Sequence, residues 1–234
     1  GAKTFITNAP IGDVFSVFAY NDINKGPAAG VTCFLVERDA PGFSTGKPFD
    51  KMGYRGSPTA ELFLDDCEVS EDAVLGEVGK GFIQAMQTLE YGRIGMALGS
   101  LGIATACLEY SNKYSKERKA FGRFINRYQE VSFKLADMLI MTDISRLMIY
   151  RAAWAKENSD PEAAVFASCA KVFATESATK ISNMAVQIHG GYGYMKDYAV
   201  ERLYRDAKLG EIGEGTSELQ RILIAKDLID KYAS

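Results

Sequence analysis

A glycine-flanked carboxylate stands directly before a predicted helix near the end of this 234-residue sequence. Residues 211–220 read EIGEGTSELQ, in which Glu214 lies between two glycines and the helix is predicted to begin at Ser217. A helix start exposes N–H groups and the positive end of the helix dipole, so it binds anionic or carbonyl-like groups. Ser217 with Gln220 also fits a capping box that only stabilises the helix start. From spacing alone, a site and a structural cap are equally good interpretations.

Two further segments carry residue types suited to binding. QIHGGYGY (187–194) has paired glycines, but they follow a predicted helix, whereas the dinucleotide fingerprint needs a strand before its glycines. A helix C-cap is therefore the favoured interpretation. KERKAFGRFINRYQ (116–129) combines cations with a Phe-Gly turn, and the helix dipole alone would explain Arg118. Glu90 and Arg93 are three apart on one predicted helix, and as an exposed pair they would contribute only about 0.2–0.5 kcal/mol.

Composition argues against several functional classes. The 27 basic and 30 acidic residues give a formal net charge of −3, which disfavours a nucleic-acid surface. With His189 as the only histidine, no metal site and no Ser-His-Asp triad are predicted. No run of eighteen apolar residues is present, so no membrane span is expected. Four scattered cysteines are predicted to be buried thiols in a reducing compartment: Cys33, Cys67, Cys107 and Cys169.

The hydrophobic period changes once along the chain. Three β-branched and aromatic runs, at 14–20, 30–37 and 59–66, predict strands of a small antiparallel barrel or sandwich. The first two runs are apolar on both alternating faces, so both faces are expected to be covered. From Gly79 onward the period is helical, and long helices with short loops predict an antiparallel four-helix bundle. The predicted helices cover about 82–114, 128–156, 161–190 and 217–232. The predicted fold class is therefore α+β.

Successive segments of the sequence resemble the acyl-CoA dehydrogenases, and most of all their short-chain, butyryl-type bacterial members. The segments are KTFITNAP, KMGYRGSPTAELFLDD, GRIGMALGSLGIA, ERKAFG, VQIHGGYGYMKDYAVERLYRDAK and EGTSELQR. They cover essentially the whole chain in order. The resemblance implies that residues 1–75 form the middle β domain of the family and residues 76–234 its C-terminal four-helix-bundle domain. It also implies that the N-terminal helical domain of the family is absent from this chain.

The resemblance implies FAD as the cofactor, lying between the β domain and the bundle and completed by a neighbouring subunit. Phe5, Ile6 and Thr7 would lie against the flavin ring. The other implied cofactor contacts are Arg118, Phe121, Gln129, Gln187, Ile188, His189, Gly190, Gly191, Thr216, Ser217 and Glu218. Backbone N–H groups and arginine are what a pyrophosphate needs.

The resemblance also implies a role for Glu214. It matches the catalytic base that removes a proton from Cα of an acyl thioester while a hydride leaves Cβ for the flavin, giving a trans-2-enoyl thioester. Such a carbon acid needs a desolvated carboxylate and a carbonyl polarised by fixed donors, one of them the Glu214 N–H in the family. Some relatives carry the base at the position of Gly92, which has no carboxylate here. The implied substrate contacts are Glu90, Arg93, Gly213 and Gly215.

Two departures from the family pattern keep the substrate open. Gly213 stands where a Tyr usually precedes the base, and Glu90 where many members have Asp. Alternatives to acyl-CoA are therefore an acyl or aminoacyl group on a carrier protein, or reoxidation by oxygen. A flavin-free structural relative is a third hypothesis, against which the retained EGTSE and QIHGG segments argue. The resemblance further implies an electron-transferring flavoprotein as acceptor, a homotetramer or homodimer, and a bacterial cytoplasm, or the mitochondrial matrix in a eukaryote.

Overall fold

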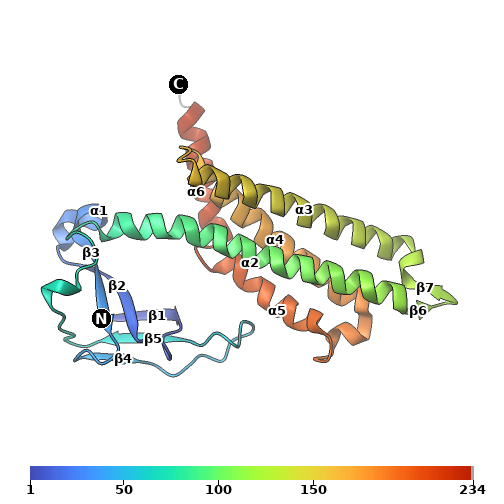
Figure 1. Cartoon of the computed structure of the whole chain (residues 1–234), viewed down its shortest axis with the longest axis horizontal. Helices are drawn as coiled ribbons and strands as arrows, with labels where there is room; N and C mark the ends of the chain where they lie inside the picture. The colour runs from blue at the N-terminus through green and yellow to red at the C-terminus, as the bar shows by residue number, and fades with distance from the viewer. Residues whose placement is uncertain (233–234) are drawn as a thin grey trace. The chain divides into compact units, whose positions relative to one another are not determined.

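The computed structural model describes residues 1–232, which form two compact units, Gly1–Leu89 and a second that begins at Glu90. The boundary between the units falls inside one continuous helix, α2 (Gly81–Glu117), labelled in Figure 1. The first unit contains two antiparallel sheets and the second a bundle of long helices. The predicted α+β fold is therefore confirmed.

The strands of the first unit follow the predicted runs closely. The runs at 14–20, 30–37 and 59–66 form β2 (Val14–Tyr20), β3 (Val31–Glu37) and β5 (Thr59–Leu64). β2 pairs with β3, with Val17 opposite Phe34. β5 lies between two strands that were not assigned from the sequence, β1 (Ala2–Thr7) and β4 (Phe43–Thr45).

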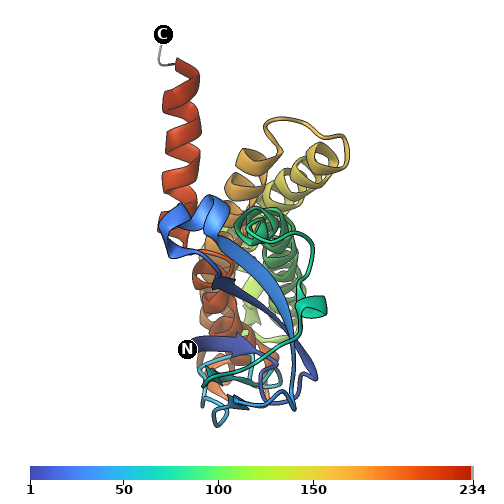
Figure 2. The ribbon, with the colours of Figure 1, turned by 90° about the vertical axis from the view of Figure 1, so that its left-hand side faces the viewer.

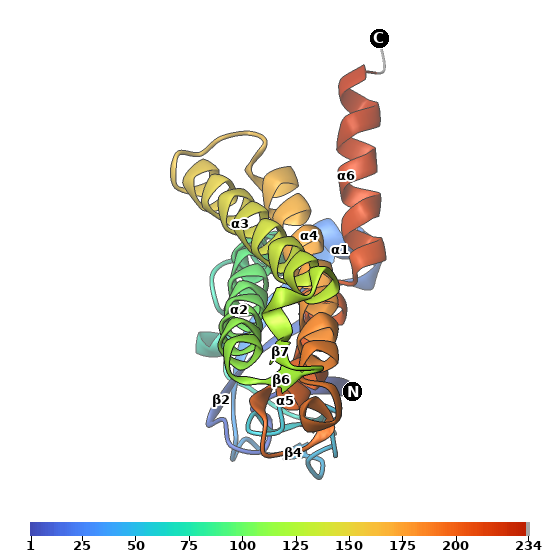
Figure 3. The same ribbon diagram turned by 90° about the vertical axis from the view of Figure 1, so that its right-hand side faces the viewer.

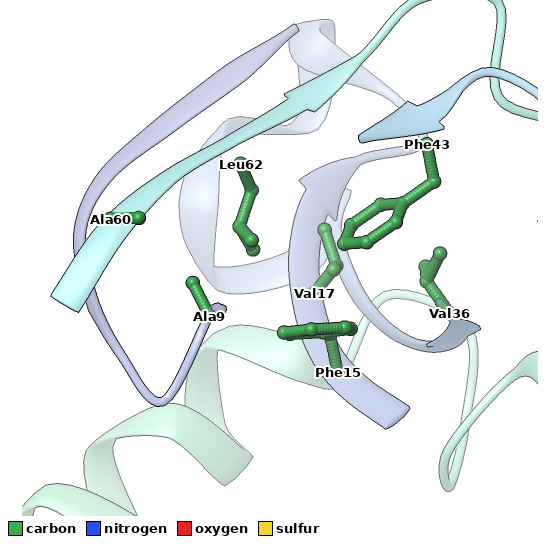
Figure 4. Close-up of a cluster of buried hydrophobic side chains, with 7 residues drawn as sticks. All are labelled: Ala9, Phe15, Val17, Val36, Phe43, Ala60 and Leu62. Carbon is green, nitrogen blue, oxygen red and sulfur yellow. The ribbon is translucent and has the colours of Figure 1, made fainter. Parts of the chain in front are cut away.

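A small apolar core joins the two sheets of the first unit, as Figure 4 shows. The rings of Phe15 and Phe43 lie 4.8 Å apart between centroids, and Leu62 packs in the same cluster. Arg38 closes one side, because its guanidinium lies 5.7 Å from the Phe15 ring and donates to the carbonyls of Ala9 and Gly12. The core members are Ala9, Phe15, Val17, Val36, Phe43, Ala60 and Leu62.

The expectation that β2 is covered on both faces is wrong for this chain. Phe15 and Val17 are buried, whereas Val14 and Tyr20 are exposed, so burial follows the alternation of the strand. β3 differs, because Val31, Thr32 and Cys33 are buried in succession. All four cysteines are free, but only two are buried, since Cys67 and Cys169 are partly exposed. Burial raises the pKa of the Cys107 thiol to about 12.

The second unit is built from α2 and four further helices. They are α3 (Gln129–Glu157), α4 (Ala163–His189), α5 (Ala199–Ile212) and α6 (Ser217–Tyr232). Ile94 of α2 and Ile149 of α3 pack against a stripe of alanines on α4 at positions 167, 170 and 174. The small alanine side chains let these helices approach closely. By length and composition alone, α2 could span a membrane, and only part of its apolar surface is buried by this packing.

The helix α5 was not predicted, and like α6 it packs against α4. Its sequence is amphipathic, but its overall hydrophobicity is low, because many charged residues surround the buried positions Val200, Ala207 and Gly210. α6 starts at the bundle and then runs away from it, as Figures 2 and 3 show from opposite sides. Consistent with that course, Leu228 and Ile229 are exposed.

Candidate active site

Glu214 lies on a strained bend between α5 and α6. Gly213 ends α5 with φ −67°, whereas Glu214 and Gly215 both have left-handed backbone, with φ 55° and 86°. A non-glycine residue held in the left-handed region costs on the order of 1–3 kcal/mol and persists only where its surroundings enforce it. Only Gly215 meets this conformation without cost. The bend therefore has to be supported by neighbouring groups.

The support comes partly from the start of α6, and it differs from the predicted capping box. Thr216, not Ser217, is the N-cap, because its Oγ1 accepts from the Leu219 N–H at 3.3 Å. Gln220 does not reach back to the cap. Its amide donates to the carbonyls of Glu214 and Gly215, at 3.2 and 3.3 Å. The Ser217 hydroxyl is buried and has no hydrogen-bond partner within residues 1–232.

The Glu214 carboxylate lies beside α2 at Gly92. A Cβ built at position 92 would sit 2.2 Å from Glu214 Oε2 and 2.8 Å from its Cδ, closer than any real contact. Only glycine at position 92 leaves room for the carboxylate where it stands. Glu214 itself is exposed, and its backbone N–H makes no hydrogen bond within the described residues. The bend thus presents a carboxylate and an unpartnered donor side by side.

A buried arginine contributes charge to the same region. Arg93 is only 8% exposed, and burial lowers the pKa of its guanidinium, while the charges of Glu90 and Glu214 oppose that shift. The interpretation of Glu90 and Arg93 as an exposed helical pair is wrong, because Glu90 forms its ion pair with Lys156 of α3. Lys156 also lies 4.9 Å from the Tyr91 ring.

A buried lysine on α4 completes the support of the bend, and sequence reasoning missed it. The Lys171 side chain is fully buried, and its ammonium donates to the Gly215 carbonyl at 2.7 Å. Burial lowers the pKa of Lys171, and nearby carboxylates, foremost Glu211, oppose the shift. A lysine is ordinarily exposed, so only its place among buried helix positions, such as Ala167, Ala170 and Ala174, could have drawn attention to it.

A second candidate region is a cavity of about 530 Å³ at the end of α4. Its lining residues are Tyr114, Arg118, Ile125, Ile188, His189, Gly190, Gly191, Tyr192 and Met195. Arg118 lies over the Tyr192 ring, with its guanidinium carbon 5.7 Å from the centroid. A Cβ at either Gly190 or Gly191 would meet nothing within 4 Å, so this wall is bare backbone.

His189 forms part of this wall. Its Nδ1–H donates to the Ala185 carbonyl at 2.8 Å, and its ring stacks on Tyr114 with centroids 4.4 Å apart. Burial lowers the pKa of His189. The adjoining Gly190 has φ 60°, and its N–H donates to the carbonyls of Val186 and Gln187, which confirms the predicted C-cap.

The remaining predicted cofactor residues do not line this cavity. Phe121 is 97% exposed at the tip of a two-stranded hairpin, β6 (Lys119–Ala120) with β7 (Arg123–Phe124), and Gln129 is exposed at the start of α3. Phe5, Ile6 and Thr7 belong to the first unit, where Ile6 and Thr7 line a cavity of about 360 Å³. Phe5 has φ 56° and lies 5.5 Å from the ring of Phe49.

Comparison with protein families matches nearly the whole chain. The family described as acyl-CoA dehydrogenase, middle domain, matches residues 1–67, and the one described as acyl-CoA dehydrogenase, C-terminal domain, matches residues 79–229. The chain belongs to the acyl-CoA dehydrogenase family. The matches agree with the order of domains that the resemblance implied, while the boundary predicted at 75/76 remains a prediction.

Individual members of the acyl-CoA dehydrogenase family are similar over 97–98% of this chain. The 3-(aryl)acrylate reductase of Clostridium sporogenes is 50% identical over 98% of the chain and 60% of its own length. The structure of butyryl-CoA dehydrogenase from Megasphaera elsdenii has a TM-score of 0.94 at 44% identity, covering 98% of this chain and 59% of that one. The prolyl acyl carrier protein oxidase AnaB has a TM-score of 0.93 at 37% identity, covering 97% and 60%. The chain thus spans about 60% of the length of these relatives.

Proposed function

We propose that the protein to which this chain belongs is a flavin-dependent enzyme that removes hydrogen from Cα and Cβ of an acyl thioester. The observation that carries the proposal is Glu214 on its strained bend beside Gly92, with a backbone N–H next to the carboxylate that has no partner within residues 1–232. Strained backbone at a charged residue is typical of reacting groups. The family membership of the chain and the similarity to butyryl-CoA dehydrogenase support this reaction class.

We propose FAD as the cofactor, because the residues fit it. The wall at Gly190 and Gly191 is open backbone beside Arg118, which suits a pyrophosphate, and the buried Ser217 hydroxyl lacks a partner within residues 1–232. When bound, FAD would supply an acceptor for the hydride that leaves Cβ. The proposed contacts otherwise follow the resemblance: Phe5, Ile6, Thr7, Phe121, Gln129, Gln187, Ile188, His189, Thr216 and Glu218.

The Glu214 carboxylate would take the proton from Cα. The Glu214 N–H would bind the thioester carbonyl oxygen and stabilise the negative charge that develops there as the Cα–H bond breaks. Because Glu214 is exposed in this chain, the acyl group itself would have to exclude water from the carboxylate. Arg93 places a buried positive charge near the carboxylate, and Gly213, Gly215 and Glu90 complete the proposed substrate contacts.

The same residues can catalyse the reaction in either direction, dehydrogenation of the acyl thioester or reduction of the enoyl thioester. A dehydrogenase forms the Cα–Cβ double bond, whereas the name of the Clostridium sporogenes relative denotes a reductase. By microscopic reversibility, Glu214 would return the proton to Cα in the reductive direction. We propose oxidation with an electron-transferring flavoprotein as acceptor, in a homotetramer or homodimer located in a bacterial cytoplasm, or in the mitochondrial matrix if the source is eukaryotic.

A carrier-protein thioester is the second candidate substrate. Gly213 favours it, because glycine beside the base leaves more room than the usual Tyr, and the similarity to the prolyl acyl carrier protein oxidase is consistent with a bulky acyl group. The space is not empty, however. A Cβ at position 213 would meet Met96 Cε at 3.0 Å, so Met96 occupies part of it.

Anaerobic reduction of the bound flavin by a panel of acyl thioesters tests the proposal. The panel pairs each straight or branched acyl group on CoA with the same group on a carrier protein. We expect bleaching of the flavin absorbance by at least one CoA thioester. Bleaching by carrier-bound thioesters alone would replace CoA with the second candidate. A colourless protein, or a flavin that no thioester reduces, would contradict the proposed reaction and favour the structural relative.

A further inference from the structure

The bend that carries Glu214 is tied to a buried cation on another helix. Lys171 of α4 has 0% of its surface exposed, and its ammonium donates to the Gly215 carbonyl at 2.7 Å. We propose that Lys171 is a positioning residue whose ammonium fixes the bend, so that the Glu214 carboxylate stays where it removes the α-proton. This inference rests on the proposed function of Glu214 as the base.

Burying a lysine at position 171 destabilises the fold unless the charge of its ammonium makes a favourable interaction. Removing an ammonium from water is costly, and a methionine would fill the same space without that cost. Within residues 1–232, the hydrogen bond of Lys171 goes to a backbone carbonyl, not to a carboxylate. The carboxylates whose charges act on it are Glu211, Glu176, Glu214 and Glu218. The ammonium therefore sits in a negative environment and binds the bend directly.

Three helices contact the bend, and each contributes a different kind of contact. Lys171 from α4 and Gln220 from α6 bind the bend carbonyls, and Gly92 from α2 leaves space for the carboxylate. Glu214 keeps φ at 55°, a conformation it would leave if its neighbours allowed. Lys171 fixes the Gly215–Thr216 peptide, and Gln220 fixes the preceding peptide through the Glu214 carbonyl. With both peptides held, the backbone cannot rotate at Gly215, and this limits the direction of the Glu214 side chain.

Loss of the ammonium should affect catalysis more than folding. Gln220 would still donate to the Gly215 carbonyl, so that acceptor would not be left without a partner. Thr216 would still cap α6. The bend would then be held by Gln220 alone, through two long hydrogen bonds. Glu214 could relax toward negative φ, which moves its carboxylate away from Gly92 while the surrounding helices keep their packing.

The test compares Lys171→Met with Lys180→Met in the FAD-loaded, complete protein. Lys180 lies on the same helix but is exposed, so its variant controls for the loss of one positive charge. Four quantities are measured: kcat, KM, thermal stability, and exchange of the Cα hydrogens of a 3,3-dimethylbutyryl thioester in D2O. This thioester has no hydrogen on Cβ, so exchange reports the proton step without flavin reduction.

We expect Lys171→Met to lower kcat and the exchange rate together by roughly 10- to 100-fold, as for a displaced catalytic group, with KM changed less than about threefold. FAD content and Tm should match those of Lys180→Met. Rates within twofold of Lys180→Met would overturn the inference. So would a loss of kcat that follows loss of FAD or of folded protein, because that pattern marks a purely structural lysine.

Lys171→Gln serves if the methionine variant does not fold. It retains a polar head group but is one atom shorter and uncharged, so the same loss of kcat and exchange is expected. A parent enzyme that neither reduces its flavin nor exchanges Cα hydrogens would refute the proposed function instead. The two failures are therefore distinguishable.

Discussion

Two helix ends in the second unit use left-handed backbone in opposite ways. After α4, Gly190 has φ 60° and leaves open space where a side chain would be. Before α6, Glu214 takes nearly the same φ, 55°, although it has a side chain, and Lys171 and Gln220 hold the bend. The first end offers bare backbone to a cavity, whereas the second fixes the position of a carboxylate. If the proposed roles hold, the binding wall is formed at a glycine, which adopts this φ without strain, and the catalytic base is a residue whose backbone is strained.

Among the variants that test this difference between the two helix ends, removal of the Glu214 carboxylate should lower the reaction rate most. Glu214→Gln keeps the size of the side chain but not the base, so we expect flavin reduction by substrate to slow by about 10³–10⁴-fold. Rapid-mixing absorbance measurements check this, with the exposed Glu109→Gln as control. FAD content should equal that of the parent. Loss of FAD would make Glu214 structural, and reduction at the parent rate would place the base elsewhere.

Crowding the carboxylate should have the next largest effect. In Gly92→Ala, the added methyl would lie 2.2 Å from Oε2 of Glu214 and push the carboxylate aside, so we expect kcat to fall roughly 10- to 100-fold. Gly95→Ala on the same helix is the matched control, because its methyl would meet nothing within 4 Å. Both changes remove a helical glycine, which favours the helix by roughly 0.5–1 kcal/mol.

The two alanine variants must therefore differ in turnover while Tm stays at or above the parent value in both. Equal turnover would mean that the carboxylate tolerates displacement, and the constraint at the bend would then be irrelevant to catalysis.

At the end of α4, adding a side chain to Gly190 should lower the free energy of unfolding. Gly190 combines φ 60° with ψ −137°, a region open almost only to glycine, so Gly190→Ala should lower the free energy of unfolding by about 1–3 kcal/mol. Gly191→Ala should leave it nearly unchanged. Both methyl groups would point into open space, so packing cannot account for a difference. Denaturant unfolding measures it, and equal stability of the two variants would refute the assigned conformation.

Substrate preference should respond to the residue before the base. Gly213 has φ −67° and ψ 157°, which any residue adopts, so Gly213→Tyr is compatible with the backbone. The ring must displace the flexible end of Met96, 3.0 Å from the new Cβ. We expect the ratio of kcat/KM for branched over straight acyl thioesters to fall roughly 10-fold, and to rise in Met96→Ala. An unchanged ratio in both variants would show that this space does not contact the acyl group.

Much of the architecture was predictable because it depends on local patterns. Strands at 14–20 and 59–66 follow from their β-branched and aromatic runs, and the C-cap at Gly190 from the glycines that end a helical period. α5 was missed because it is short and rich in charged residues, so its overall hydrophobicity is low although its sequence is amphipathic. The exposed face of β2 was missed because apolar residues occupy both of its sides.

The site was predictable only in part, for a different physical reason. Glu214 stood out by its flanking glycines and its place before a helix. The residues that hold the bend could not be recognised in the same way. Lys171 is 43 residues away from Glu214, and its hydrogen bond to the Gly215 carbonyl produces no pattern in the local sequence. Ser217 and Gln220 were misassigned as a capping box because they match its spacing, whereas Thr216, the residue that caps the helix, is followed by Leu219 at the third position. Only the geometry shows that Thr216 caps α6 and that Gln220 turns inward.

The smallest expected effect concerns His189, the last residue of α4. Burial lowers the pKa of His189 in the folded protein, whereas in the unfolded chain it keeps its ordinary value of about 6.5. Between these two values the unfolded state binds more protons, so the free energy of unfolding falls as pH decreases through about 6.5 and levels off below the folded-state pKa. His189→Phe keeps an aromatic ring against Tyr114 but cannot titrate.

Denaturant unfolding of the parent and of His189→Phe between pH 5 and 7.5 measures this contribution. Carboxylates that titrate near pH 5 are common to both proteins and cancel in the difference, and His189 is the only histidine in the sequence. The parent should therefore lose stability relative to the variant as pH falls across this window, and the difference should vanish at the upper end of it apart from a constant offset. Parallel pH curves would mean that the imidazole accepts a proton as readily in the folded wall as in water, which its burial between Tyr114 and the Ala185 carbonyl argues against.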